Sequence, residues 1–181
     1  MKYNKSEFEL SRLIKIDKIP RGGIEERIKA RPKEREGLQK RFHLEALTRL
    51  EALINVDHTR KHMFEVKGRL WADVVMRCVV TLEPVPLTIE DSIDVLYAPP
   101  AMIASAEDMS ELGDLDQPEP IENGGIDLGE LVAQHLAMAL PLYPRKEGVS
   151  FGEAEYHGDS DQAENPFVVL RDSIKDKEKT E

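Results

Sequence analysis

The chain has a single cysteine, Cys78, and five histidines, and a thiol beside an imidazole is a common arrangement for nucleophilic catalysis. Cys78 lies between Met76 and Val80 in a stretch where every even position is apolar or glycine, so we expect its side chain on the buried face of a strand. A reactive cysteine needs an accessible, electropositive setting, whereas a buried free cysteine packs as a small apolar side chain. The pattern therefore predicts a structural cysteine.

Two histidines have a spacing that suits metal binding. His58 and His62 are four residues apart, which would place both imidazoles on one face of a helix. They flank Arg60 and Lys61, whose positive charges repel a cation, and no cluster of cysteines or carboxylates adjoins them. The sequence also lacks glycine-rich phosphate loops and the nucleophile elbow of hydrolases. We therefore predict no catalytic residue, no metal site, no cofactor and no enzymatic activity.

Positive charge is concentrated in the first part of the chain. Residues 1–80 contain 19 Lys and Arg against 12 Asp and Glu, while residues 81–181 contain 6 against 23. Clusters of lysine and arginine bind phosphates by releasing counterions, so the first part suits RNA. Interleaved acids such as Glu25 and Glu34 leave open the alternative of an ordinary charged surface. The candidate RNA-binding residues are Arg21, Arg27, Lys29, Arg31, Lys33, Arg35, Lys40 and Arg41.

The elements that would position these residues follow from the apolar pattern. Alternating apolar residues predict strands over 8–16 and 24–30, with a turn at 20–23 between them. From about residue 33 to 54 the apolar residues recur every three or four positions, which predicts a long amphipathic helix that begins near Pro32.

The even-numbered apolar run continues from residue 64 to 82. A straight strand of that length would span about 63 Å at ~3.3 Å per residue, so we expect it to curve or turn, with Gly68 as a candidate break. Pro84 and Pro86 are assigned to the following turn, because proline has no N–H for a central ladder. A returning strand is expected at 87–95, where the apolar residues are odd-numbered.

The second part of the chain has an acidic spacer and a strong helix signal. Residues 101–123 carry seven acids and no base, which is typical of a mobile surface loop. A helix is predicted over 127–140, with Asp127 as its N-cap, Glu130 as the capping-box partner and Pro141 as its stop.

The composition suits one domain with a solvated end. The chain has no run of 18 apolar residues, no apolar secretory signal and no cysteine pair, so a cytoplasmic location is expected. We predict a single domain over 1–175 and a disordered charged tail at 176–181. The expected fold is α+β, a curved antiparallel sheet, open or barrel-like, packed with the two amphipathic helices.

Three segments follow one another in a specific order: "RCVVTLEPVPLTIEDSIDVLYAP" at 77–99, "IDLGELVAQHLAMALPLYPR" at 126–145 and "ENPFVVLRDSIK" at 164–175. Together they resemble the YceD family, also called large ribosomal RNA subunit accumulation protein. The motif residues that carry this resemblance are Cys78, Leu82, Glu83, Pro84, Asp127, Leu128, Glu130, Leu140, Pro141, Tyr143, Pro144, Asn165, Pro166 and Phe167. Relatives with further cysteines imply no metal or redox role here, because this chain retains only Cys78.

The resemblance implies a bacterial ribosome-biogenesis factor without enzymatic activity. Such a factor would support the synthesis, processing or stability of large-subunit (23S) ribosomal RNA by binding RNA or a large-subunit ribosomal protein. The alternative is an adaptor or chaperone whose acidic segment at 101–123 shields a basic ribosomal protein. A metal-dependent nuclease is a third, weaker hypothesis.

Overall fold

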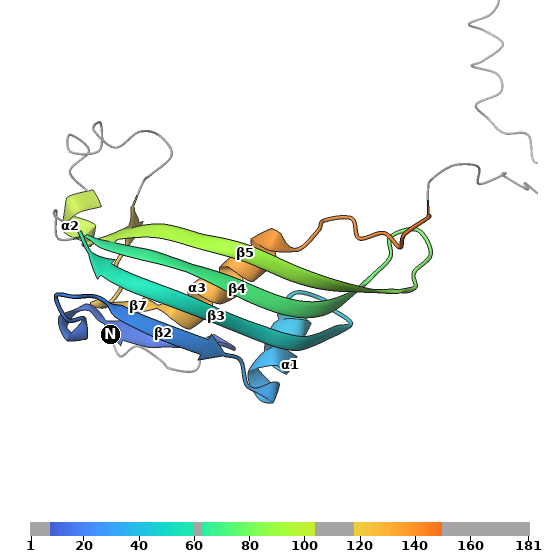
Figure 1. Cartoon of the computed structure of the whole chain (residues 1–181), viewed down its shortest axis with the longest axis horizontal. Coiled ribbons are helices and arrows are strands. Elements are labelled where there is room, and N and C mark those ends of the chain that lie inside the picture. The colour runs from blue at the N-terminus through green and yellow to red at the C-terminus, as the bar shows by residue number, and fades with distance from the viewer. Residues whose placement is uncertain (1–7, 60–62, 104–117, 150–181) are drawn as a thin grey trace, which may run out of the picture. The chain divides into compact units, whose positions relative to one another are not determined.

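The computed structural model describes residues 8–59, 63–103 and 118–149 (Figure 1). The fold is α+β, as predicted, with a mixed five-stranded sheet in the order β2-β3-β4-β5-β6 and a small sheet in which β1 pairs with β7. The strands are β1 (Leu13–Lys15), β2 (Ile24–Lys29), β3 (Ala46–His58), β4 (Phe64–Arg77), β5 (Pro84–Ala98), β6 (Glu119–Pro120) and β7 (Gly125–Asp127). The helices are the 3-10 turn η1 (Ile16–Lys18), α1 (Pro32–Arg41), α2 (Pro100–Ile103) and α3 (Leu128–Ala139).

Three long antiparallel strands, β3, β4 and β5, form the centre of the larger sheet. Their side chains alternate between the two faces, so one face of β4 carries a continuous apolar row and the other carries charged residues. The order β2 to β6 leaves β2 and β6 at the edges, and the sheet is not closed into a barrel. The barrel-like alternative is therefore wrong, because in the described residues β2 pairs with neither β5 nor β6.

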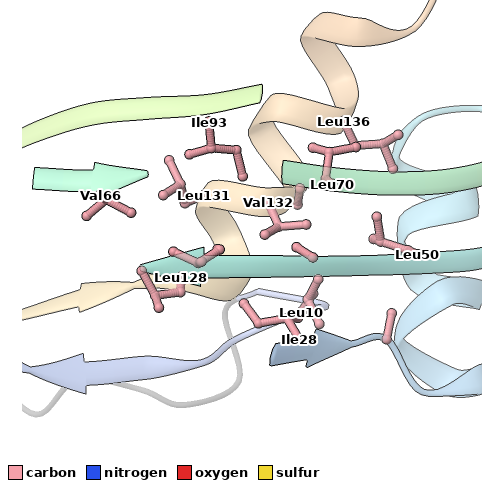
Figure 2. Close-up of a cluster of buried hydrophobic side chains, with 14 of the residues drawn as sticks. Leu10, Ile28, Leu50, Val66, Leu70, Ile93, Leu128, Leu131, Val132 and Leu136 are labelled. Atoms are coloured by element: carbon pink, nitrogen blue, oxygen red, sulfur yellow. The ribbon is translucent and has the colours of Figure 1, made fainter. Parts of the chain in front are cut away.

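Helix α3 covers the apolar face of the sheet (Figure 2). Its N-cap Asp127 accepts the N–H groups of Gly129 at 3.0 Å and Glu130 at 3.2 Å, so the predicted helix and cap are confirmed. Four apolar side chains then repeat on one side of the helix and meet residues from several strands and from the N-terminal segment. The buried cluster in Figure 2 includes Leu10, Ile28, Leu50, Val66, Leu70, Ile93, Leu128, Leu131, Val132 and Leu136. Complete burial of each such side chain stabilises the fold by roughly 1.5–3 kcal/mol.

The predicted helix over 33–54 is wrong in its second half. Helix α1 ends at Arg41, and Ala46–His58 form β3. A β-bulge between Leu47 and Arg49 shifts the register, so that Leu47 and Leu50 both face the core although they are three residues apart. That spacing imitates a helical repeat, whereas the alternation after Leu50 is that of a strand.

The run that begins at residue 64 forms one strand without a break at Gly68, which corrects that expectation. Gly68 pairs with Ile54 of β3 and with Ile93 of β5. A Cβ atom at Gly68 would lie 2.4 Å from the backbone oxygen of Leu53, so glycine lets β3 and β4 approach closely at this point. The strand ends at Arg77, earlier than the apolar parity suggests.

Both prolines assigned to the turn belong to β5, and this assignment was also wrong. The N–H of Cys78 donates to the oxygen of Glu83 at 2.8 Å, so the alternating register makes Arg77–Pro84 and Val75–Pro86 non-hydrogen-bonded pairs. The N–H that each proline lacks would have pointed away from β4. Because no described strand pairs with the opposite edge of this part of β5, the prolines cost no ladder hydrogen bond.

Two further expectations are corrected, one for the strand predicted near the N-terminus and one for the acidic spacer. Only Leu13–Lys15 of the strand predicted over 8–16 is paired, with β7 as its partner. The spacer predicted as a loop over 101–123 contains β6, which pairs with β5 in parallel, and a buried Ile121. Residues 104–117 of the spacer and the tail at 176–181 lie outside the described residues.

Candidate nucleic-acid interface

Five basic residues follow the chain from β2 into α1, and we call Arg27, Lys29, Arg31, Lys33 and Arg35 the basic strip. Within 27–35 the only acid is Glu34. The alternation of β2 buries Ile28 at 2% exposure and leaves its neighbours exposed, while Pro32 begins the helix at its first turn. Every member of the strip is exposed except the half-buried Arg35.

The strip keeps most of its positive charge. Lys29 Nζ lies 2.9 Å from Glu51 Oε1, and this hydrogen bond lowers the pKa of the Glu51 carboxyl. Arg35 donates to the backbone oxygen of Ala30 at 2.7 Å, which fixes its side chain without neutralising it. Lys33 makes no hydrogen bond or ion pair within the part of the chain that the structure describes.

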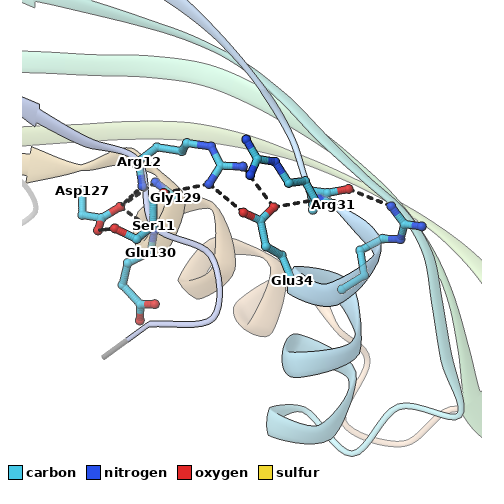
Figure 3. A network of polar contacts seen from close by, with 9 residues as sticks. Ser11, Arg12, Arg31, Glu34, Asp127, Gly129 and Glu130 are labelled. Atoms are coloured by element: carbon cyan, nitrogen blue, oxygen red, sulfur yellow. Dashed lines mark hydrogen bonds and ion pairs between the residues drawn. The ribbon is translucent and has the colours of Figure 1, made fainter. Parts of the chain in front are cut away.

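A polar network anchors the strip to the rest of the fold (Figure 3). The Arg12 guanidinium donates to both carboxylate oxygens of Glu34, at 2.9 and 3.0 Å, and Glu34 also accepts the N–H of Arg31 at 2.7 Å. The N–H of Arg12 donates to Asp127 at 2.7 Å, so the first turns of α1 and α3 are joined through one residue. Glu34, the only acid within the strip, is thus paired with Arg12, which lies outside the strip.

The contacts of Glu34 in Figure 3 favour its ionised form. Burial would raise the pKa of its carboxyl, but the Arg12 hydrogen bonds, the Arg31 N–H and the two nearby positive charges hold the pKa below its ordinary value of 4.5. Glu34 is therefore a firmly ionised partner for Arg12, and the free positive charge of this region belongs to the strip.

The outer face of the sheet adds one arginine that the sequence did not single out. Arg27 pairs with Leu53 of β3, and Leu53 pairs with Arg69 of β4, so the two arginines stand in one row across the sheet. Arg69 is exposed. Only the strand register brings Arg69 beside the strip, because 41 residues separate it from Arg27 in the chain.

Three other candidate RNA-binding residues lie apart from the strip. Arg21 precedes β2 and Arg31 follows it, so the length of that strand separates them. Lys40 is exposed near the last turn of α1. Arg41 is held in a bidentate pair with Glu130 of α3, at 2.9 and 2.7 Å, and also contacts Glu9 at 3.2 Å. The guanidinium of Arg41 therefore joins two helices, and Glu130 is not the capping-box partner expected for Asp127.

Cys78 is buried with no exposed surface, as predicted, but it lies in the turn after β4 and not on the strand. Its sulfur accepts the N–H of Thr81 at 3.4 Å. The side chain of Thr81 and the backbone N–H groups of Thr81, Lys146 and Val80 outweigh burial and lower the pKa of the thiol to about 6. Such donors stabilise a thiolate without giving it access to a substrate.

Two of the motif segments meet around this turn. The N–H of Val79 donates to the oxygen of Pro144 at 2.9 Å, and Lys146 Nζ lies 2.8 Å from Glu83. The turn that contains Leu82, which is 66% exposed at a positive φ of 60°, is thereby fastened to the segment that follows α3. Of the remaining motif residues, Tyr143 is exposed, and Asn165, Pro166 and Phe167 lie outside the described residues.

The histidines do not form a metal site in the described ranges. His58 ends β3 and its Nε2 contacts the oxygen of Ile19 at 3.2 Å, while His62 lies outside the described residues. His135 of α3 contacts Asp91 of β5 at 3.2 Å. Over 8–59, 63–103 and 118–149, no group of three or more His, Cys, Asp or Glu could hold a metal ion. None of the described helices is both long and apolar enough to cross a membrane.

Comparison with known proteins identifies a family. A family model described as "Large ribosomal RNA subunit accumulation protein YceD" matches residues 66–180, which is more than half of the chain. No curated protein and no solved structure matches the chain. The matched range begins in β4 and includes the Cys78 turn, β5 and α3, whereas the basic strip precedes it.

Proposed function

The chain belongs to the YceD family of large ribosomal RNA subunit accumulation proteins, and from this premise we propose that it is a non-enzymatic ribosome-biogenesis factor that binds RNA through the basic strip. A role in the accumulation of large-subunit ribosomal RNA follows from the family. In the proposal the factor supports synthesis, processing or stability of that RNA in the cytoplasm, by contact and without chemistry.

The observation that carries the RNA proposal is the exposure of four strip cations on one continuous stretch of chain. Arg27 and Lys29 lie on one face of β2, and Arg31 and Lys33, which are also exposed, follow them in the chain at the start of α1. The N-terminal end of a helix adds a partial positive charge that favours phosphate. Since Glu34 is already paired with Arg12, little negative charge within the strip opposes a phosphate backbone.

The strip suits the backbone of RNA better than its bases. Sequence-tolerant stacking needs several exposed aromatic rings, and the nearest aromatic in the register is the half-buried Trp71, across from Glu51. We therefore expect binding that depends strongly on salt and weakly on sequence. If all five cations contact phosphates of a single strand, the slope of log K against log salt is about −3.5.

The surroundings of Cys78 support a role without catalysis. The sulfur is fully buried, and its hydrogen-bond partners are backbone N–H groups and the Thr81 side chain. A nucleophilic mechanism needs a general base within hydrogen-bond reach, and no described histidine is hydrogen-bonded to this turn.

The test is RNA binding by a triple variant, Arg27→Gln, Arg31→Gln and Lys33→Gln, measured by fluorescence anisotropy with large-subunit rRNA fragments across a salt series. We expect the salt slope to fall in magnitude by about 2, since three phosphate contacts are lost. The three positions are exposed, so the variant should fold normally.

A matched control removes the same charge from the segment that precedes β2 in the chain, with Lys15→Gln, Lys18→Gln and Arg21→Gln. These side chains are exposed and lie outside the strip. If both triple variants reduce affinity and slope equally, the strip is not the RNA surface. If neither changes them, RNA contact through the first part of the chain is wrong.

A further inference from the structure

A cavity of about 230 Å³ lies where β6, β7, the start of α3 and the end of β5 meet. Its size is below the roughly 300–1,000 Å³ of pockets that take whole small-molecule ligands, but it can hold one long side chain. Apolar residues, among them Phe8, Leu13 and Leu131, form part of its lining. None of the residues that line it is Lys, Arg or His.

Four carboxylates line the cavity, and they differ in how fully they are paired. Glu130 is paired with Arg41, and Asp127 accepts N–H groups from Arg12 and from the first turn of α3. Glu119 and Glu122 are exposed at the cavity and have no hydrogen-bond or ion-pair partner among their side-chain contacts in the described residues. The carboxylates of Glu119 and Glu122 therefore carry negative charge that no basic side chain of the described residues neutralises.

The second, independent feature is Tyr97, which is 8% exposed and lines the same cavity. Its ring belongs to the core face of β5, next to Glu119 in the β5–β6 pairing. No residue in the described part of the chain hydrogen bonds to its hydroxyl. Burial, followed by the charges of Glu119 and Asp127, raises the pKa of this hydroxyl. The ring is buried while the unpartnered hydroxyl stays accessible, so the hydroxyl can hydrogen bond to a polar group that enters the cavity.

We propose that this cavity is a binding site for an arginine side chain presented by a basic partner protein. The guanidinium would donate to the Tyr97 hydroxyl oxygen and to the carboxylates of Glu119 and Glu122, and its methylene stem would lie along Leu13 and Leu131. Arginine combines an apolar stem with several N–H donors in a planar group, which matches a cavity lined by apolar walls, a hydroxyl and free acids. A metal ion fits less well, because the carboxylates of the described residues do not converge into a group that could hold one.

The site does not include the basic strip, because none of the residues that line the cavity belongs to β2 or to α1. The two proposals therefore fail separately. Variants of the strip should leave the cavity unaffected, and variants of the cavity should leave the salt slope for RNA unaffected.

The experiment uses the full chain and a short peptide that carries three arginines, with affinity measured by calorimetry and the location by amide shifts of Gly125 and Gln134 in ¹⁵N spectra. The double variant Glu119→Gln and Glu122→Gln should weaken peptide binding by about tenfold, since two charge pairs are lost. Tyr97→Phe, which leaves the net charge unchanged, should weaken it by about fivefold through the lost hydrogen bond.

The matched control for charge is Glu90→Gln, an exposed acid on the opposite face of β5. It should change the affinity by less than about twofold, because exposed charges more than a Debye length apart interact weakly. A peptide with citrulline in place of arginine controls for shape and should not bind.

Three results would overturn the proposal. Equal losses in the Glu90 variant and in the double variant would show general attraction to an acidic chain and no built site. Binding of the citrulline peptide would exclude recognition of the positive charge. Free arginine or spermidine that binds the cavity as tightly as the peptide would assign the site to a small cation and not to a partner protein.

Discussion

The pair between Arg41 and Glu130 gives the sharpest stability prediction, because the same arginine is also a candidate RNA contact. Arg41 ends α1 and donates through both terminal nitrogens to the carboxylate of Glu130 in the first turn of α3. The side chain of Glu130 is 8% exposed and that of Arg41 is 33% exposed. The hydrogen bonds to Glu130, opposed by burial and supported by Glu9, raise the pKa of Arg41 further above its ordinary range.

Arg41→Met keeps the apolar stem and removes the charge, so that Glu130 retains only the Gln134 side-chain N–H, 3.3 Å away, as a side-chain partner in the described structure. Exposed pairs contribute about 0–1 kcal/mol, and breaking a buried pair costs about 3–5 kcal/mol. Since one partner is buried and the other partly exposed, we expect the free energy of unfolding to fall by about 2–4 kcal/mol. Glu130→Gln should cost less, about 1–2 kcal/mol, because Arg41 keeps Glu9 and the amide oxygen remains an acceptor.

The assay is urea unfolding followed by circular dichroism and by fluorescence of Trp71, the only tryptophan. The double variant should show a coupling energy of about 1–2 kcal/mol between the two positions, with an unchanged slope against urea. Lys40→Met is the matched control, since Lys40 is exposed and adjacent, and it should cost no more than about 0.5 kcal/mol. RNA affinity should stay within about twofold in Arg41→Met. If that variant is as stable as Lys40→Met but loses RNA affinity, then the guanidinium belongs to the interface and the structural reasoning is wrong.

Three further predictions test other parts of the structure. Gly68→Ala should lower the free energy of unfolding by about 1–3 kcal/mol, because its Cβ would collide with the backbone of Leu53, whereas Gly22→Ala, with open space around the Cβ, should change it by less than about 0.5 kcal/mol in the same urea assay. The thiolate absorbance of Cys78 near 240 nm should rise with a midpoint near pH 6, and loss of the Thr81 donor in Thr81→Val should move that midpoint upward; an unshifted midpoint would contradict the assigned cause. The carboxyl of Glu34 has a pKa below 4.5 in the folded state, so its contribution to stability is complete above pH 4.5 and is lost as the pH falls through the folded value. Glu34→Gln should therefore flatten the loss of stability below pH 4.5, and an unchanged acid limb in urea midpoints would refute the pairing with Arg12.

Much of the fold could be predicted from local patterns, and the failures have physical causes. The alternation of β4 and the cap of α3 are local features, so they were read correctly from the sequence. The bulge between Leu47 and Arg49 breaks the strand alternation and places the buried Leu47 and Leu50 three residues apart. The local sequence pattern cannot distinguish this spacing from that of a helix. Strand pairing decides whether a proline is tolerated, and for that reason the place of Pro84 in β5 could not be read from its chemistry alone.

Of the candidate sites, only the basic strip could be predicted from the sequence, because the other contacts join residues that are far apart in the chain. The basic strip is continuous in sequence and was found there. The partner of Arg41 is 89 residues away, and the register that aligns Arg69 with Arg27 involves three strands, so neither could be deduced from spacing. The cavity required Tyr97 and Glu119 to be brought together by β6, a strand of two residues inside a segment whose composition is that of a loop.

The family match covers one of the two proposed binding sites more fully than the other. The match covers 66–180, and most of the residues that line the cavity lie in this range, whereas the basic strip at 27–35 lies before it. The motif residues Cys78, Glu83 and Pro144 fasten the β4–β5 turn to the segment after α3. They act as packing and hydrogen-bonding residues, so the resemblance that they carry describes the scaffold more directly than any contact with RNA. If strip variants abolish RNA binding but leave rRNA accumulation in cells intact, while cavity variants reduce accumulation, the scaffold serves a protein partner and the strip is a secondary contact. The reverse result would place the function of the chain in its first strands.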